Sequence, residues 1–191
     1  MIEGERDAAD PAGQGLAHHP AVVSSSLDSY AFISAWVEHA NRDRLIDWRF
    51  GVPRLREALR LFTAPDPIDE LHMRGPNKTG KTYTKAAFIS ACLQKRDSLD
   101  GVPIPKWDGP VKGLQLVLDY PQQLLSVKPA YEMALAGWPH KVRNNGDYLH
   151  SIKVMPVGGN ERSSVDWSVI YFLTQKNRDT GRGARADIVD F

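Results

Sequence analysis

Apolar residues in the first third of the chain recur at the three- and four-residue spacing of amphipathic helices. A first helix is predicted to begin near Ser26 or Asp28, and a second near Pro53, because the fixed φ of proline suits the first helical position. The pattern therefore predicts a helical lead-in over residues 26–66. Its two apolar stripes are Tyr30, Ile33, Trp36, Val37 and Ala40, followed by Leu55, Ala58, Leu59 and Phe62.

The segment before this lead-in has no such period. Residues 1–25 are rich in Gly, Pro, Ala and Ser, a composition that buries little surface and predicts a flexible tail. The pair His18-His19 lies there without further ligands at a metal-site spacing, so we interpret it as solvated.

Beyond residue 67 short apolar runs alternate with helical patterns, which predicts an α/β layer fold with a mainly parallel central sheet over residues 67–191. The short connection between the runs at 151–157 and 169–174 favours an antiparallel hairpin attached to that sheet. The other predicted strands are 68–73, 113–120 and 187–191, and the predicted helices are 82–96 and 121–137, the latter interrupted or started at Pro129.

Composition is that of an ordinary globular protein. The chain has 191 residues, of which 42% are hydrophobic and 25% charged, and this excludes collagen-like, coiled-coil and wholly disordered chains. The net charge of +1 gives no global attraction to nucleic acid or anionic lipid, so a contact with DNA would need a local patch. The single cysteine, Cys92, cannot form an internal disulfide and fits a cytoplasmic location.

One motif carries specific chemistry. Residues 75–82 read Gly75, Pro76, Asn77, Lys78, Thr79, Gly80, Lys81 and Thr82, which matches the phosphate-binding pattern G-x-x-x-x-G-K-[ST]. An apolar run precedes the motif and a helix-forming run follows it, so backbone N–H groups and a helix N-terminus can surround a phosphate. Lys81 is then expected at the β- and γ-phosphates, and the Thr82 hydroxyl at Mg²⁺. The sequence therefore predicts binding of ATP with Mg²⁺.

Other candidate residues have a functional and a structural interpretation. Trp48 and Phe50 could flank an adenine ring or belong to the core, and Lys78 could contact the γ-phosphate or lie in solvent. Asp119 follows a predicted strand at the edge where open sheets bind ligands, but capping of the next helix is the simpler role. Cys92 lies within an apolar helix, which favours a buried structural thiol. A basic stretch could contact phosphate or be a solvated loop: Lys176, Arg178, Arg182 and Arg185.

The order of these elements resembles the ATPase domain of phage large terminases, the motors that package viral DNA. The resemblance covers residues 45–191, and only the phosphate-binding motif is specific by itself. The passages that carry it are 48–62, 71–82 (LHMRGPNKTGKT), 114–121 and 168–191 (SVIYFLTQKNRDTGRGARADIVDF).

This resemblance implies a three-layer P-loop ATPase that assembles as an oligomer, in the host cytoplasm, with double-stranded DNA, a portal and a small terminase subunit. Lys81 and Thr82 match the Walker A lysine and hydroxyl, and Asp190 is the candidate for the Mg²⁺-linked Walker B acid. The family's Asp-Glu pair and nuclease domain would follow Phe191, so we expect the chain as given to bind ATP and hydrolyse it slowly. The alternatives from other classes are a small-molecule or nucleotide kinase and a non-catalytic nucleotide-binding module.

Overall fold

The computed structural model describes Ser34, Glu38, residues 42–64, Leu71, residues 80–174 and residues 185–190. The chain divides into two units, Met1–His39 and Ala40–Phe191. Ser34 and Glu38 are helical, and every other described residue belongs to the second unit. The tail predicted over 1–25, most of the first predicted helix and the predicted strand 68–73, apart from Leu71, lie outside the described residues.

The second unit combines helices and strands. Its helical elements are α2 (Pro53–Phe62), α3 (Lys81–Leu93), α4 (Tyr120–Gln122), the π-helical turn η1 (Gln123–Val127) and α5 (Lys128–Leu135). Its strands are β1 (Ser98–Leu99), β2 (Val102–Pro103), β3 (Lys112–Val117), β4 (His140–Asn145), β5 (Tyr148–Val154), β6 (Ser168–Thr174) and β7 (Ile188–Asp190).

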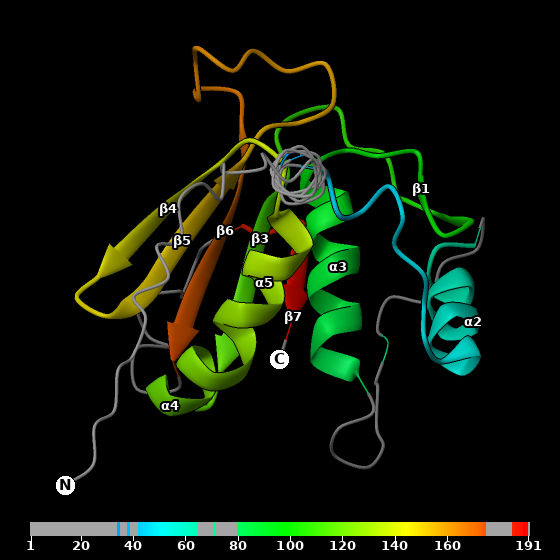
Figure 1. Ribbon diagram of the computed structural model, residues 1–191, viewed down its shortest axis with the longest axis horizontal. Coiled ribbons are helices and arrows are strands. Elements are labelled where there is room, and N and C mark those ends of the chain that lie inside the picture. Colours follow the sequence, from blue (N-terminus) through cyan, green and yellow to red (C-terminus); the bar gives the residue numbers. More distant parts are fainter. Residues whose placement is uncertain are drawn as a thin grey trace, which may run out of the picture. The chain divides into compact units, whose positions relative to one another are not determined.

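The larger of the two sheets has five strands in the order β4-β5-β6-β3-β7 (Figure 1). Strand β3 lies parallel to both β6 and β7, whereas β4–β5 and β5–β6 pair antiparallel. The sheet is thus mixed: two of its four strand pairings are parallel, so the prediction of a mainly parallel sheet holds only in part for the described strands. The predicted antiparallel pairing of the runs at 151–157 and 169–174 is confirmed as β5–β6. Strands β4 and β5 pair antiparallel because only Gly146 and Asp147 separate them, and so short a turn cannot form the crossover that parallel neighbours need.

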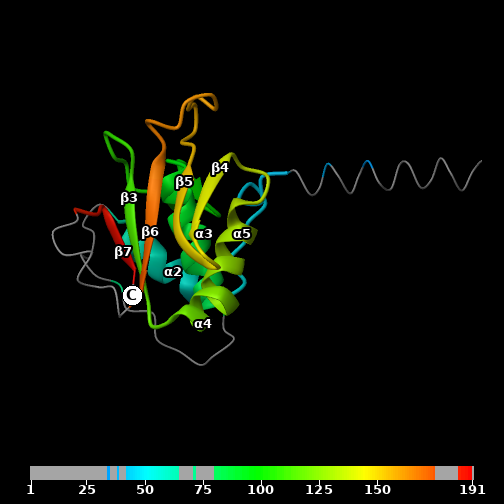
Figure 2. The same ribbon diagram turned by 90° about the vertical axis from the view of Figure 1, so that its left-hand side faces the viewer.

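Helices α3, α4 and α5 lie on one face of this sheet (Figures 1 and 2). Among the described residues no helix covers the opposite face, so the described part has two layers where the resemblance implies three. The core between helices and sheet is formed by buried aliphatic and aromatic side chains. They include Ile89, Leu93, Tyr131, Leu135, Ile152, Ile170 and Phe172.

The predicted helix at Pro53 is confirmed as α2, which ends at Phe62 and buries Leu59 against a second core cluster. That cluster also contains Phe88 of α3, so α2 belongs to the same unit as the sheet. The unit boundary consequently lies at residues 39/40 and not at 66/67, because the second half of the lead-in packs on α3.

The helical region predicted over 121–137 is present as three successive segments, α4, η1 and α5. Pro129 lies in the first turn of α5, and the π-helical turn comes directly before it. Because Val127 and Lys128 also have helical backbone angles, the missing N–H of Pro129 interrupts the hydrogen-bond ladder of a continuous helical segment. Within that turn the buried amide of Gln123 accepts a hydrogen bond from the N–H of Leu149 (3.0 Å) and donates one to its carbonyl (2.8 Å). These bonds fix the π-helical turn to β5.

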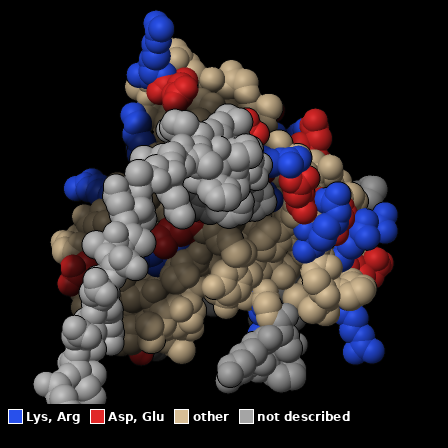
Figure 3. All heavy atoms as spheres, in the orientation of Figure 1, with Lys and Arg blue, Asp and Glu red and all other residues tan. Residues whose placement is uncertain are grey.

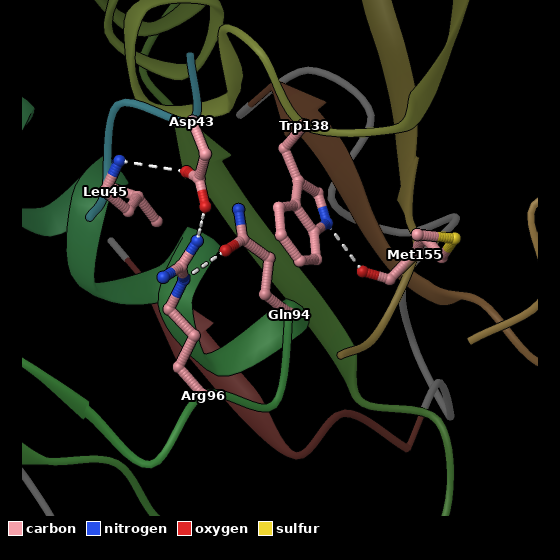
Figure 4. A network of polar contacts seen from close by, with 6 residues as sticks. All are labelled: Asp43, Leu45, Gln94, Arg96, Trp138 and Met155. Carbon is pink, nitrogen blue, oxygen red and sulfur yellow. Dashed lines mark hydrogen bonds and ion pairs between the residues drawn. The ribbon is translucent and has the colours of Figure 1, made fainter. Parts of the chain in front are cut away.

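A polar network ties the lead-in to the end of α3 (Figure 4). The buried carboxylate of Asp43 accepts a hydrogen bond from the N–H of Leu45 (3.0 Å) and pairs with the guanidinium of Arg96. Arg96 also donates to Gln94 and lies 5.1 Å from the ring centroid of Trp138, whose indole N–H donates to the carbonyl of Met155 (2.7 Å). Segments distant in sequence are thus joined at one point.

The hairpin strand β4 was not predicted, because its run His-Lys-Val-Arg-Asn-Asn is polar and almost entirely exposed. The predicted strands at 113–120, 151–157, 169–174 and 187–191 are confirmed as β3, β5, β6 and β7, with ends that differ by up to three residues. None of the helices in the described ranges is long and apolar enough to cross a membrane.

Candidate functional site

The site begins at the N-terminus of α3, which the motif at 75–82 enters. Gly80 is the N-cap residue and has a left-handed conformation (φ 77°, ψ 8°), which glycine adopts without steric strain. Its carbonyl accepts the first helical hydrogen bond, from the N–H of Thr84 (2.9 Å). Lys81 is partly buried and Thr82 is exposed in this first turn. Residues 75–79 of the motif, Lys78 included, lie outside the described part of the chain.

Helix α3 starts at the carboxyl edge of the parallel strands (Figure 1). Strands β3, β6 and β7 run in the same direction; Val117 and Thr174 are register partners at that edge, and Asp190 lies beside Gln115, two residues before it. In open α/β sheets this is the edge where ligands bind. The N-terminus of α3 and the end of β7 therefore belong to one region of the molecule.

Asp190 contacts α3 directly. Its carboxylate forms an ion pair with the ammonium group of Lys85, and the two side chains are 12% and 28% exposed, respectively. Lys85 is four residues after Lys81 and thus on the same side of α3, one turn further along. Sequence reasoning missed Lys85, although its four-residue spacing from the motif lysine was a usable signal.

A buried hydrogen bond lies beside Asp190. Gln115 on β3 is the register partner of Asp190, and its side-chain oxygen accepts a hydrogen bond from the hydroxyl of Tyr131 (3.1 Å). Burial, and then the negative charge of Asp190, raise the pKa of Tyr131 well above its usual value. The phenol therefore stays a protonated donor.

The residues present fit Mg²⁺ and a phosphate by the chemistry of their donors. Thr82 offers a hydroxyl oxygen and Asp190 a carboxylate oxygen, and Mg²⁺ prefers hard oxygen ligands. In the described ranges no group of three His, Cys, Asp or Glu side chains could hold a metal ion by itself. Nucleotide-bound Mg²⁺ commonly uses one or two protein oxygens and completes its shell with phosphate and water.

Asp119 has the structural role. It is the N-cap of α4, and its carboxylate accepts a hydrogen bond from the N–H of Gln122 (2.8 Å). The side chain of Gln122 in turn accepts one from the N–H of Leu118 (2.9 Å). The capping interpretation is thereby confirmed.

Trp48 and Phe50 lie in the core. Phe50 is 8% exposed within the second core cluster, and Trp48 is a partly buried side chain packed against it. The N–H of Phe50 donates to the carboxylate of Asp100 (3.2 Å), which fixes this segment to the β1–β2 turn. The structure thus favours the core interpretation of these rings over an adenine contact.

The two remaining candidates are Cys92 and the basic stretch at 176–185. The thiol of Cys92 is fully buried in α3, and this burial raises its pKa far above the usual range, which agrees with a structural role. Of the basic stretch at 176–185 only Arg185 is described, and it is exposed.

A separate cleft of about 610 Å³ opens at the other end of α3. It is lined by Lys95, Trp107 and Gly158 among others, and Lys95 is about 20 Å along the helix axis from Lys81. The cleft is therefore not part of the site at the start of α3.

Comparison with known proteins gives no relative: no family model, no curated protein and no solved structure matches the chain.

Proposed function

We propose that this protein binds ATP with Mg²⁺ at the N-terminus of α3 and is the ATP-binding part of a viral DNA-packaging motor. One observation carries the proposal: the helix that follows the G-x-x-x-x-G-K-T motif begins with a left-handed glycine at the carboxyl edge of parallel strands, beside Asp190. The same motif before a helix at the amino edge of the sheet would not support nucleotide binding.

Different groups of the chain contact the phosphates and the Mg²⁺ ion. The N–H groups at the start of α3 and the positive end of its dipole attract phosphate, and the ammonium of Lys81 adds a charge-assisted contact. Thr82 and Asp190 would hold Mg²⁺, which neutralises phosphate charge when bound. Since Lys85 pairs with Asp190, the carboxylate keeps a cationic partner without the metal.

The role in packaging rests on the resemblance to large terminases. It is supported by the order of elements, in which a helical lead-in, the motif, β3 and a late strand follow one another. It is further supported by β7, which ends in Asp190 and lies directly beside β3. Coupling of ATP hydrolysis to movement of double-stranded DNA, with a portal and a small subunit in an oligomer, is the activity proposed for the assembled protein.

Calorimetric titration of the chain with Mg²⁺-ATP tests the first step. Lys81→Ala should weaken binding by about 1.5–3 kcal/mol, because a charge-assisted contact to phosphate is lost. The matched control is Lys106→Ala, which removes an exposed lysine that is paired with Asp97 at the far end of the molecule. Equal affinity of Lys81→Ala and the unchanged protein would reject the nucleotide site.

The reaction class is tested with phosphate acceptors. A packaging ATPase transfers the γ-phosphate to water alone, and the rate should respond to double-stranded DNA. Radiolabelled ATP incubated with a panel of nucleosides, nucleotides and sugars distinguishes this from a kinase, since a labelled acceptor would reject the motor assignment.

A further inference from the structure

The sheet face opposite α3 and α5 carries a line of basic side chains. Lys141 on β4 is directly opposite Lys153 on β5, Lys153 is opposite Val169 on β6, and Val169 is opposite Lys112 on β3. All three lysines are exposed. Adjacent strands are about 4.8 Å apart, so this lysine row spans about 14 Å across the sheet.

Side chains along β6 point alternately to the two faces of the sheet, and this alternation places the lysine row on the face opposite the helices. Ile170 and Phe172 lie in the core beneath the helices, and the residues between and before them point to the other side. Tyr171 therefore lies on the same face as Val169, about 6.6 Å further along the strand. Its side chain is 43% exposed, and the ring of His150 meets it edge-on at 6.2 Å between centroids.

A second row of side chains crosses the same four strands beside the lysine row, and it contributes one more cation and some apolar surface to this face. Arg143 is opposite Ser151, which is opposite Tyr171, and Tyr171 is opposite Leu114. Beyond Leu114 lies Val189, which is 46% exposed. This face thus combines four cationic side chains with an accessible aromatic ring.

The lysines have few compensating charges. None of the ion pairs between described residues joins Lys112, Lys141 or Lys153 to a carboxylate. The ammonium of Lys153 reaches the carbonyl of Ser164 (3.5 Å), and that of Lys141 lies 5.1 Å from the ring centroid of Trp167. The carboxylate of Asp187, beside the row, accepts a hydrogen bond from the backbone N–H of Lys112.

This concentration of like charge needs an explanation. Like charges directly opposite each other on neighbouring strands destabilise a sheet, as with Lys141 and Lys153. The helix-bearing face, by contrast, shows intermixed positive and negative side chains (Figure 3), in keeping with a net charge of +1. A bound polyanion would relieve the repulsion, whereas an apolar layer on this face would bury the cations at a high cost.

We propose that this sheet face binds single-stranded nucleic acid, with phosphates along the lysine row and a base stacked on Tyr171. An exposed ring beside a cationic row suits a strand whose bases are unpaired, because every base offers a π-face. A duplex hides its bases, and an acidic peptide or a lipid surface would use the lysines without the ring. The proposal goes beyond the proposed function and is independent of the nucleotide site.

Fluorescence anisotropy of the full chain with a labelled 20-nucleotide oligo-dT tests the lysine row. The triple variant K112Q/K141Q/K153Q is compared with R54Q/R60Q/K106Q, which removes three exposed cations from other surfaces and gives the same net charge. The first should bind at least tenfold more weakly at low salt, and its plot of log K against log salt should be less steep by about 2. The second should bind like the unchanged protein, and equal losses in both would overturn the proposal.

Substitution of Tyr171 distinguishes base stacking from charge attraction, because it leaves the charge of the protein unchanged. Tyr171→Ala should weaken binding about fivefold to 150-fold, the range for loss of one stacked base, while Tyr171→Phe should retain it. Melting temperatures establish that the variants are folded. Full binding by Tyr171→Ala, or equal affinity for oligo-dT, a 20-base-pair duplex and polyglutamate, would overturn the proposal. Unchanged Mg²⁺-ATP affinity in these variants keeps this test separate from that of the nucleotide site.

Discussion

Replacing Asp43 with alanine should destabilise the fold strongly, although Asp43 is distant in sequence from the groups it contacts. Its carboxylate is 8% exposed and pairs with Arg96, which is 14% exposed. Removal of one partner leaves a buried charge uncompensated, which costs about 3–5 kcal/mol. For a unit of this size that corresponds to a fall in melting temperature of roughly 6–20 °C. Thermal and urea unfolding, followed by circular dichroism, measure it.

The matched control is Asp47→Ala. Asp47 also pairs with an arginine, Arg42, at 3.0 Å, but both side chains are more than half exposed, so the expected loss is only about 0–1 kcal/mol. The double variant D43A/R96M removes both buried charges and should be more stable than Asp43→Ala alone. If Asp43→Ala loses no more stability than Asp47→Ala, the network in Figure 4 does not hold the lead-in to α3.

Three further predictions concern the sites. Asp190→Asn should still bind ATP in the absence of metal, but Mg²⁺ should increase its affinity for ATP by about 1–3 kcal/mol less than in the unchanged protein. Calorimetry with and without EDTA measures this difference, and an equal effect of Mg²⁺ on both proteins would exclude Asp190 as a ligand. Cys92 should not react with a thiol reagent at pH 8 until the protein unfolds, because burial raises its pKa and keeps the thiol protonated; rapid labelling of the native protein would contradict its burial. Duplex DNA should bind weakly, without sequence preference, and be released by added salt, given a net charge of +1; tight, salt-resistant binding to one sequence would contradict this.

The amino-acid sequence alone determined the elements whose signals are local. Pro53 and the apolar stripe through Leu59 predicted α2, and the run after the motif predicted α3, because helix propensity and a period of 3.6 residues act within a few turns. Alternating and continuous apolar runs identified β3, β5 and β6 in the same way. The role of Asp119 as a cap was also readable, since it depends on a residue three positions away.

Tertiary structure alone decided what depends on distant residues. The strand order and the polar hairpin strand β4 follow from pairing partners that local patterns do not encode. The ion pair between Lys85 and Asp190 joins residues more than a hundred positions apart, and the lysine row exists only because β4, β5, β6 and β3 align in one register. Strand register sets which side chains meet across a sheet, so a charged surface of this kind becomes visible only once the strands are paired.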